Sequence, residues 1–225
     1  MGVDSLWTWD HFYPLYGDPE ASHFEGYSIL AAMAATTKNV AQIGAMVSCN
    51  SYRNPQLLAD MARTIDHISG GRFVLGIGSG WFERDYTEYR YEFGSAPGRL
   101  KALGSALPII KERLAKLNPA PLGPLPILIG GGGEKVTLRL VARHAQMWNG
   151  FGTALELAKK NAIIDEWCAV EGTDPSKIER TTLLNASADI NLDAYAAAGI
   201  QHVILALGSP FDVSAVEAVL SRSRG

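Results

Sequence analysis

The stretch Pro126-Ile127-Leu128-Ile129-Gly130-Gly131-Gly132-Gly133 passes from apolar residues into four consecutive glycines, and a helix-like segment follows at residues 134–140. A strand that breaks into glycine and restarts as a helix is typical of an anion site. Glycine lets backbone amides approach a phosphate, and the first N–H groups of a helix are unpaired. A flexible turn without a ligand is the alternative interpretation. Four glycines in a row favour a phosphate-binding loop, so we expect a phosphorylated ligand.

Spacing excludes two familiar nucleotide-binding motifs. Lys135 follows Glu134, where a P-loop needs the pair Gly-Lys. In the segment that starts at Gly76, Trp81 stands where a dinucleotide fingerprint needs its third glycine. The ligand is therefore not assigned from either motif.

Composition indicates one globular domain that acts on small molecules. The chain has 225 residues, a net charge of −3 and no run of basic residues, so nothing indicates binding to nucleic acid or to an anionic membrane. Cys49 and Cys168 are too few for a disulfide scaffold, which fits a reducing cytoplasm. No apolar run approaches the ~20 residues of a membrane helix, and no spacing among the five histidines suggests a metal site. We expect a single cytoplasmic domain over residues 1–225.

Short β-rich runs alternate with amphipathic segments along the whole chain. The runs lie at residues 5–9, 40–47, 73–77, 126–129, 147–150, 181–186 and 202–207. Alternation of this kind predicts parallel β/α units wrapped around one core, which favours a TIM-type (β/α)8 barrel. Seven strands are one fewer than the barrel needs, so we expect a barrel that lacks its first β/α unit.

Three of the segments between the strands carry helix signals. The clearest has Asn54 as N-cap, Pro55 at the first helical position and glycines at 70 and 71 as its end, with an apolar face formed by Leu57, Met61, Ile65 and Ile68. A capping box at residues 22–25 predicts a second helix through Leu30. A third is expected at about residues 99–117, kinked at Pro108.

In such barrels the active site lies at the carboxyl ends of the strands, so the residues after each apolar run are the candidates. Asp10 and His11 follow the first run, and histidine titrates near neutral pH. They could form an acid/base pair, or they could be two polar residues of a solvated loop. Aromatic residues beside them, Trp7, Trp9, Phe12 and Tyr13, favour a pocket for a flat ring. Cys49 also follows a strand, but no motif activates it as a nucleophile.

Five motifs occur in order near the ends of the predicted strands. They are Ser5-Leu6-Trp7-Thr8-Trp9-Asp10-His11, Tyr52-Arg53-Asn54-Pro55, Asp66-His67-Ile68-Ser69-Gly70-Gly71-Arg72, Leu75-Gly76-Ile77-Gly78-Ser79-Gly80-Trp81 and Ile127-Leu128-Ile129-Gly130-Gly131-Gly132-Gly133-Glu134. Each motif alone is only weakly specific for a family. Together they resemble the bacterial luciferase-like superfamily, in particular its coenzyme F420-dependent oxidoreductases.

The resemblance implies a site for F420 or FMN at the carboxyl ends of the strands. It implies that the loop Gly130, Gly131, Gly132, Gly133 and Glu134 binds the phosphate. A non-prolyl cis peptide is implied behind the ring, within Val47, Ser48 and Cys49, and Gly78 and Gly80 are implied to border the ring and tail. Asp10 and His11 are implied to flank the reacting face, where a hydride passes between the deazaflavin and a small organic substrate.

Two departures from the family pattern limit what the resemblance implies. The family's first strand is not found in this sequence, which leaves an open edge, and we expect a homodimer. In the glucose-6-phosphate dehydrogenase branch a Glu follows the glycine that is Gly80 here, whereas this chain has Trp81. That branch is therefore not expected. An FMN-dependent monooxygenase and a non-catalytic flavin-binding barrel remain as alternatives.

Overall fold

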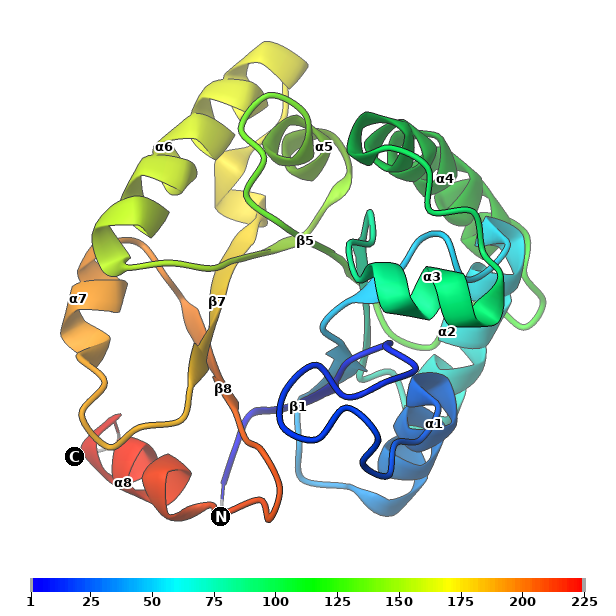
Figure 1. Cartoon of the computed structure of the whole chain (residues 1–225). Helices are drawn as coiled ribbons and strands as arrows, with labels where there is room; N and C mark the ends of the chain where they lie inside the picture. The colour runs from blue at the N-terminus through cyan, green and yellow to red at the C-terminus, as the bar shows by residue number, and fades with distance from the viewer. Residues whose placement is uncertain (1, 224–225) are drawn as a thin grey trace. The chain divides into compact units, whose positions relative to one another are not determined.

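The computed structural model describes residues 2–223, which group into two compact units (Figure 1). The first unit comprises residues 4–128, and the second comprises residues 129–223 with residues 2–3. Each of the seven predicted strand segments contains a strand. None of the described helices is long and apolar enough to span a bilayer.

The first unit contains a parallel sheet that begins at β1 (Ser5–Thr8). Its order is β1, β2 (Gln42–Ala45) and β4 (Phe73–Gly78), and the two-residue strand β3 (Ser48–Cys49) pairs with the end of β4. The segment predicted as one strand over residues 40–47 thus ends early, and the chain pairs again only at β3. This register places Cys49 opposite Gly78.

Strand β4 is buried at all six positions. A strand covered on both faces reads as a continuous apolar run, as this one does. Gly76 is required here by close approach, because an added Cβ would lie 1.9 Å from the backbone oxygen of Ala45. The core around β4 is therefore set by backbone contact as well as by side chains.

Helix α2 (Pro55–Ser69) begins and ends as predicted. The side chain of Asn54 accepts hydrogen bonds from the backbone N–H groups of the first turn, and Gly70 closes the helix in the left-handed conformation with φ 71°. The predicted buried face is wrong at Leu57 and Ile68, which are 54% and 43% exposed, whereas Ile65 is buried and Met61 is half-buried. Leu58 and the two alanines Ala59 and Ala62 are buried instead.

The other helices of this unit are α1 (Gly26–Thr36), α3 (Glu83–Tyr89) and α4 (Ala96–Lys116), and α4 packs on α2. The predicted capping box before α1 is wrong. Glu25 is itself the N-cap, since its carboxylate accepts the N–H groups of Tyr27 and Ser28. Helix α4 contains Pro108 as expected but starts three residues earlier than predicted, where Ser95 caps it.

The second unit repeats the alternation of parallel strands and helices. Its strands follow the order β5 (Ile127–Gly130), β6 (Met147–Gly150), β7 (Glu179–Asn185) and β8 (His202–Ala206), and the first two residues of β5 belong to the first unit. The helices are α5 (Thr137–His144), α6 (Ala154–Glu171), α7 (Leu192–Ala197) and α8 (Ser214–Ser223), with a 3-10 turn at Pro175–Lys177. Helices α5 and α6 pack against each other (Figure 1).

The prediction that a helix starts directly after the four glycines is wrong by three residues. Helix α5 begins only at Thr137, and Val136 in the N-cap position provides no side-chain acceptor. Its first N–H groups are therefore left without the capping that Asn54 provides for α2.

Candidate functional site

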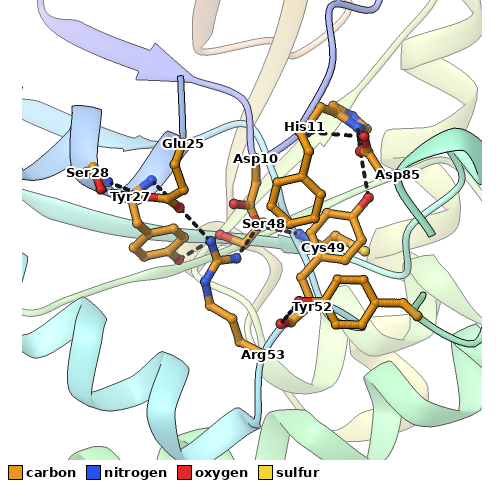
Figure 2. A network of polar contacts seen from close by, with 12 residues as sticks. Asp10, His11, Glu25, Tyr27, Ser28, Ser48, Cys49, Tyr52, Arg53 and Asp85 are labelled. Carbon is orange, nitrogen blue, oxygen red and sulfur yellow. Dashed lines mark hydrogen bonds and ion pairs between the residues drawn. The ribbon is translucent and has the colours of Figure 1, made fainter. Parts of the chain in front are cut away.

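A buried ion pair occupies the end of β1 in the first unit. Nη1 of Arg53 lies 2.6 Å from Oδ2 of Asp10, and the two side chains are 11% and 2% exposed. Nη2 of the same guanidinium lies 2.9 Å from Oε1 of Glu25. Figure 2 shows Arg53 between the two carboxylates. Arg53 therefore links the end of β1 to the start of α1.

Helix α1 fixes the Glu25 end of this link. Burial acts to raise the pKa of Glu25, but the hydroxyl and N–H groups of the helix cap, together with Arg53, outweigh it and lower the pKa. The Arg53 guanidinium also lies over the ring of Tyr27, 4.3 Å from its centroid, and the Tyr27 hydroxyl is 2.8 Å from Oγ of Ser48. Ser48 is thus held inside the network.

The carboxylate of Asp10 is only half satisfied. Its Oδ2 accepts hydrogen bonds from Arg53 and from the backbone N–H of Cys49 at 3.1 Å. Its Oδ1 is buried and accepts no hydrogen bond from the described residues. Burial raises the pKa of Asp10, while Arg53 and the Cys49 N–H act to lower it. The effect of burial is the larger, so the pKa of Asp10 lies above its ordinary value.

Replacement of Asp10 by Asn removes this titration. The pKa is raised in the folded state, so the contribution of Asp10 to stability is complete below its unfolded pKa and is lost as the pH rises through the folded pKa. We expect the free energy of unfolding of the wild type, relative to Asp10→Asn, to fall as the pH rises from 3.8 to neutrality. Urea unfolding of both proteins over this range measures the difference. A difference that is constant, or that grows with pH, contradicts the raised pKa.

His11 does not pair with Asp10, which corrects the expectation of an acid/base pair. Its Nδ1 lies 2.7 Å from Oδ2 of Asp85, which is fully buried in α3. The Tyr52 hydroxyl donates to the same oxygen at 2.7 Å, and the Phe12 N–H donates to Oδ1 at 3.1 Å. Figure 2 shows Asp85 between His11 and Tyr52. Asp10 and His11 thus have different side-chain partners, Arg53 for Asp10 and Asp85 for His11.

Aromatic rings lie around the imidazole, but of the four aromatic residues expected near His11 only Trp9 has a ring contact with it in the part of the chain that the structure describes. Trp81 and Phe82 make edge contacts with it at centroid distances of 5.7 and 5.4 Å, and Trp9 does so at 6.3 Å. The His11 side chain is 11% exposed, whereas Trp81 is 62% exposed. A ligand that reaches His11 would therefore meet an indole ring beside it.

The end of β3 places Cys49 against aromatic residues. Its Sγ lies 3.1 Å from the hydroxyl of Tyr86, and burial raises the pKa of the thiol. A neutral buried thiol is a poor nucleophile, in agreement with the sequence interpretation. Gly80 has φ 82°, and an added Cβ would lie 2.0 Å from the Tyr86 hydroxyl. Packing alone therefore requires glycine at position 80, whatever ligand binds there.

A non-prolyl cis peptide joins Met46 to Val47. The resemblance implied such a bond within Val47, Ser48 and Cys49, so it lies one peptide bond earlier than expected. It connects the end of β2 to the start of β3. The expected feature is present, with its position corrected.

In the second unit the glycine loop leaves a run of backbone donors unpaired. The N–H of Gly131 donates to the Asn149 oxygen, and the indole of Trp148 donates to the Gly131 oxygen, which anchors the start of the loop to β6. From Gly132 to Thr137 no backbone N–H donates a hydrogen bond within residues 2–223. Six consecutive free amides at the start of a helix fit an anion.

The surroundings of the loop also fit a phosphate. Gly131 has φ 125°, which favours glycine, and a Cβ on Gly133 would lie 2.9 Å from Oγ1 of Thr137, so the loop runs close to the first residue of α5. Lys160 of α6 brings a cation to the loop, because a Cβ on Gly132 would lie 3.9 Å from its Cε. Nζ of Lys160 is 2.6 Å from Oε1 of Glu134. An incoming phosphate would compete with Glu134 for this ammonium group.

Sequence reasoning missed Asp85, Tyr52 and Lys160 as site residues. Asp85 lies in a short polar helix that looks like a solvated segment, and only the fold buries it. Tyr52 belongs to the motif Tyr52-Arg53-Asn54-Pro55, but the motif does not indicate a role for its hydroxyl. Lys160 lies 27 residues after Gly133 in sequence, and nothing in the spacing predicts that α6 carries it back to the loop. Among residues 2–223, no group of three or more His, Cys, Asp or Glu side chains could hold a metal ion.

A profile of the luciferase-like monooxygenase family matches residues 1–217 of the chain. An F420-dependent glucose-6-phosphate dehydrogenase from Amycolatopsis mediterranei is 30% identical over 60% of this chain and 45% of its own length. A 5,10-methylenetetrahydromethanopterin reductase from Archaeoglobus fulgidus is 30% identical over 93% of this chain and 64% of its own length. The chain thus spans about half to two thirds of the length of these relatives.

Solved structures confirm the fold. An F420-dependent secondary alcohol dehydrogenase, in complex with an F420-acetone adduct, aligns with a TM-score of 0.78 at 18% identity, over 90% of this chain and 84% of that one. The fold class is the TIM-type β/α barrel, as the alternation of strands and helices predicted. With the family profile covering nearly the whole chain, the protein belongs to the luciferase-like monooxygenase family.

Proposed function

We propose that this chain is an oxidoreductase that uses coenzyme F420 to transfer a hydride to or from a small organic substrate. The observation that carries the proposal is the run of free amides from Gly132 to Thr137, because F420 carries a phosphate that such a run can bind. Two of the similar proteins are named as F420-dependent. Their substrates are not transferred to this chain.

In this proposal the loop from Gly130 to Gly133, with Glu134, holds the phosphate. Lys160 adds a positive charge beside it. Val47, Ser48 and Cys49, with Gly78 and Gly80, border the ring of the cofactor. When bound, F420 supplies the carbon that accepts or gives the hydride.

The residues of the chain supply proton handling and an apolar wall. Oxidation of a hydroxyl-bearing carbon removes a hydride and a proton, and in this proposal His11 accepts that proton at Nε2. Trp81 and Phe82 provide apolar rings at the edge of the imidazole. Asp10 is held by Arg53, so its role is to fix the end of β1 and the N–H of Cys49.

Titration of the purified protein with F420, and separately with FMN, followed by fluorescence, tests the proposal. We expect F420 to bind more tightly than FMN. Substitution Gly132→Asp is expected to weaken F420 binding about tenfold or more, because it places an anion among the free amides. The nearest atom to a Cβ at this position is 3.9 Å away, so the fold should tolerate the change.

The matched control is Ala169→Asp, which adds the same charge at an exposed position of α6. It should leave the dissociation constant of F420 unchanged. Tight FMN binding with no affinity for F420 contradicts the proposal and favours an FMN-dependent monooxygenase. Binding of F420 without turnover of any acceptor favours a non-catalytic barrel.

A further inference from the structure

Only one of the two ring nitrogens of His11 has a hydrogen-bond partner among the described residues. Nδ1 lies 2.7 Å from Oδ2 of Asp85, whereas Nε2 makes no hydrogen bond within residues 2–223. Neutral imidazole carries its proton on only one nitrogen, and the partner of one nitrogen decides the state of the other. The identity of the group at Nδ1 therefore determines what Nε2 can do.

Two donors fix the carboxylate of Asp85, whose side chain is fully buried. Its Oδ2 accepts from the Tyr52 hydroxyl and its Oδ1 accepts from the Phe12 N–H, and Nδ1 of His11 lies 2.7 Å from the same Oδ2. Burial, Cys49 and Asp85 together raise the pKa of Tyr52, so this hydroxyl keeps its proton and donates it. A carboxylate oxygen that already accepts from Tyr52 forms a hydrogen bond with Nδ1 when Nδ1 carries the hydrogen.

The four residues of this cluster come from three segments of the first unit. His11 and Phe12 follow β1, Tyr52 follows β3, and Asp85 lies in α3. The contacts from Tyr52 and Phe12 fix the carboxylate on both oxygens, and a fixed carboxylate orients the imidazole plane. Trp81 and Phe82 restrict the ring from its other sides.

We propose that Asp85 is a positioning residue that holds His11 in the Nδ1–H tautomer, with the lone pair of Nε2 directed at the substrate. The inference rests on the proposed function in so far as His11 exchanges a proton with the substrate. In the oxidation direction the O–H bond of the substrate breaks and an N–H bond forms at Nε2, which makes His11 an imidazolium that Asp85 stabilises. In the reduction direction the same proton returns to the product oxygen.

The first measurement is the tautomer of His11 in the cofactor-free wild-type protein. Long-range proton–nitrogen NMR correlation on protein labelled with ¹⁵N-histidine distinguishes a protonated from an unprotonated ring nitrogen, at a pH where histidine is ordinarily neutral. His11→Gln assigns the signals by their loss. We expect protonated Nδ1 and unprotonated Nε2. The opposite tautomer, or averaging between the two, overturns the proposal.

The second measurement uses Asp85→Asn. The amide can offer its NH₂ to Nδ1 while its oxygen still accepts from Phe12, so we expect His11 to change to the Nε2–H tautomer. With F420 we expect kcat to fall about 100-fold or more, with little change in the dissociation constant of F420. An unchanged kcat in a folded variant overturns the proposal.

Asp66→Asn is the matched control. Asp66 is also a fully buried aspartate of the first unit, and its Oδ2 accepts the N–H groups of Leu122 and Gly123 at 2.7 and 3.1 Å. This variant should lose stability yet keep the tautomer and kcat of the wild type. The wild-type spectrum needs neither cofactor nor turnover. Failure of F420 binding would therefore refute the proposed function, and the reversed tautomer would refute the role of Asp85.

Discussion

Replacement of His11 by Gln is expected to reduce kcat of F420-dependent turnover by about 10²- to 10⁴-fold, the range typical of a lost general acid or base. Gln can still donate to Asp85 but cannot exchange a proton at the required position. The loss should appear in kcat while the dissociation constant of F420 stays close to that of the wild type. Steady-state kinetics and fluorescence titration measure the two quantities.

His67→Gln provides the control for this prediction. His67 lies in α2, and its Nε2 is 2.8 Å from the backbone oxygen of Ala120, so it too makes a single hydrogen bond. The same chemical change there should leave kcat unaltered. Equal losses in the two variants, or full activity of His11→Gln, would show that His11 does not handle the proton.

Replacement of Arg53 by Met is expected to destabilise the fold by about 3–5 kcal/mol, the cost of leaving a buried charge without its partner. Asp10 is 2% exposed and would keep only the Cys49 N–H as a donor. The contact of Arg53 with Glu25 adds less, because that carboxylate is 42% exposed. Urea unfolding of the wild type and the variant measures the loss.

Arg113→Met is the matched comparison, since Arg113 also pairs with an aspartate of the first unit. Its guanidinium contacts Asp60 at 3.0 Å, with the two side chains 39% and 31% exposed. Solvent screens such a pair, so we expect a loss of about 1 kcal/mol or less. A double variant that carries Asp10→Asn with Arg53→Met should lose less than the sum of the two single changes. Equal losses for Arg53 and Arg113 would contradict a buried pair.

Local signals in the sequence were sufficient to predict features that depend only on neighbouring residues, such as the ends of a helix. Asn54 and Gly70 mark the ends of α2 because a cap involves only the first or last turn of a helix. The same local rule failed at α1, where Glu25 rather than Ser22 is the cap. Both residue types can accept the N–H groups of a first turn, and the tertiary contact of Glu25 with Arg53 favours Glu25.

Burial was harder to predict than helical periodicity. Leu57 and Ile68 have the spacing of a buried face yet lie largely exposed on α2. The helix is rotated so that Leu58, Ala59 and Ala62 face the core, because α4 packs closely against α2 and small residues allow that approach. Spacing shows that a helix has faces, but the packing partner decides which face is buried.

The sequence by itself determined the order of strands and helices, the glycine loop and the presence of polar residues at the end of β1. These features depend on periodicity and on backbone freedom, which are local properties. Only the tertiary structure decided the partners: Asp10 with Arg53, and His11 with Asp85. These partners lie 43 and 74 residues apart, and only the fold brings them within hydrogen-bond distance. Chemical roles that depend on such pairs cannot be read from the residue types alone.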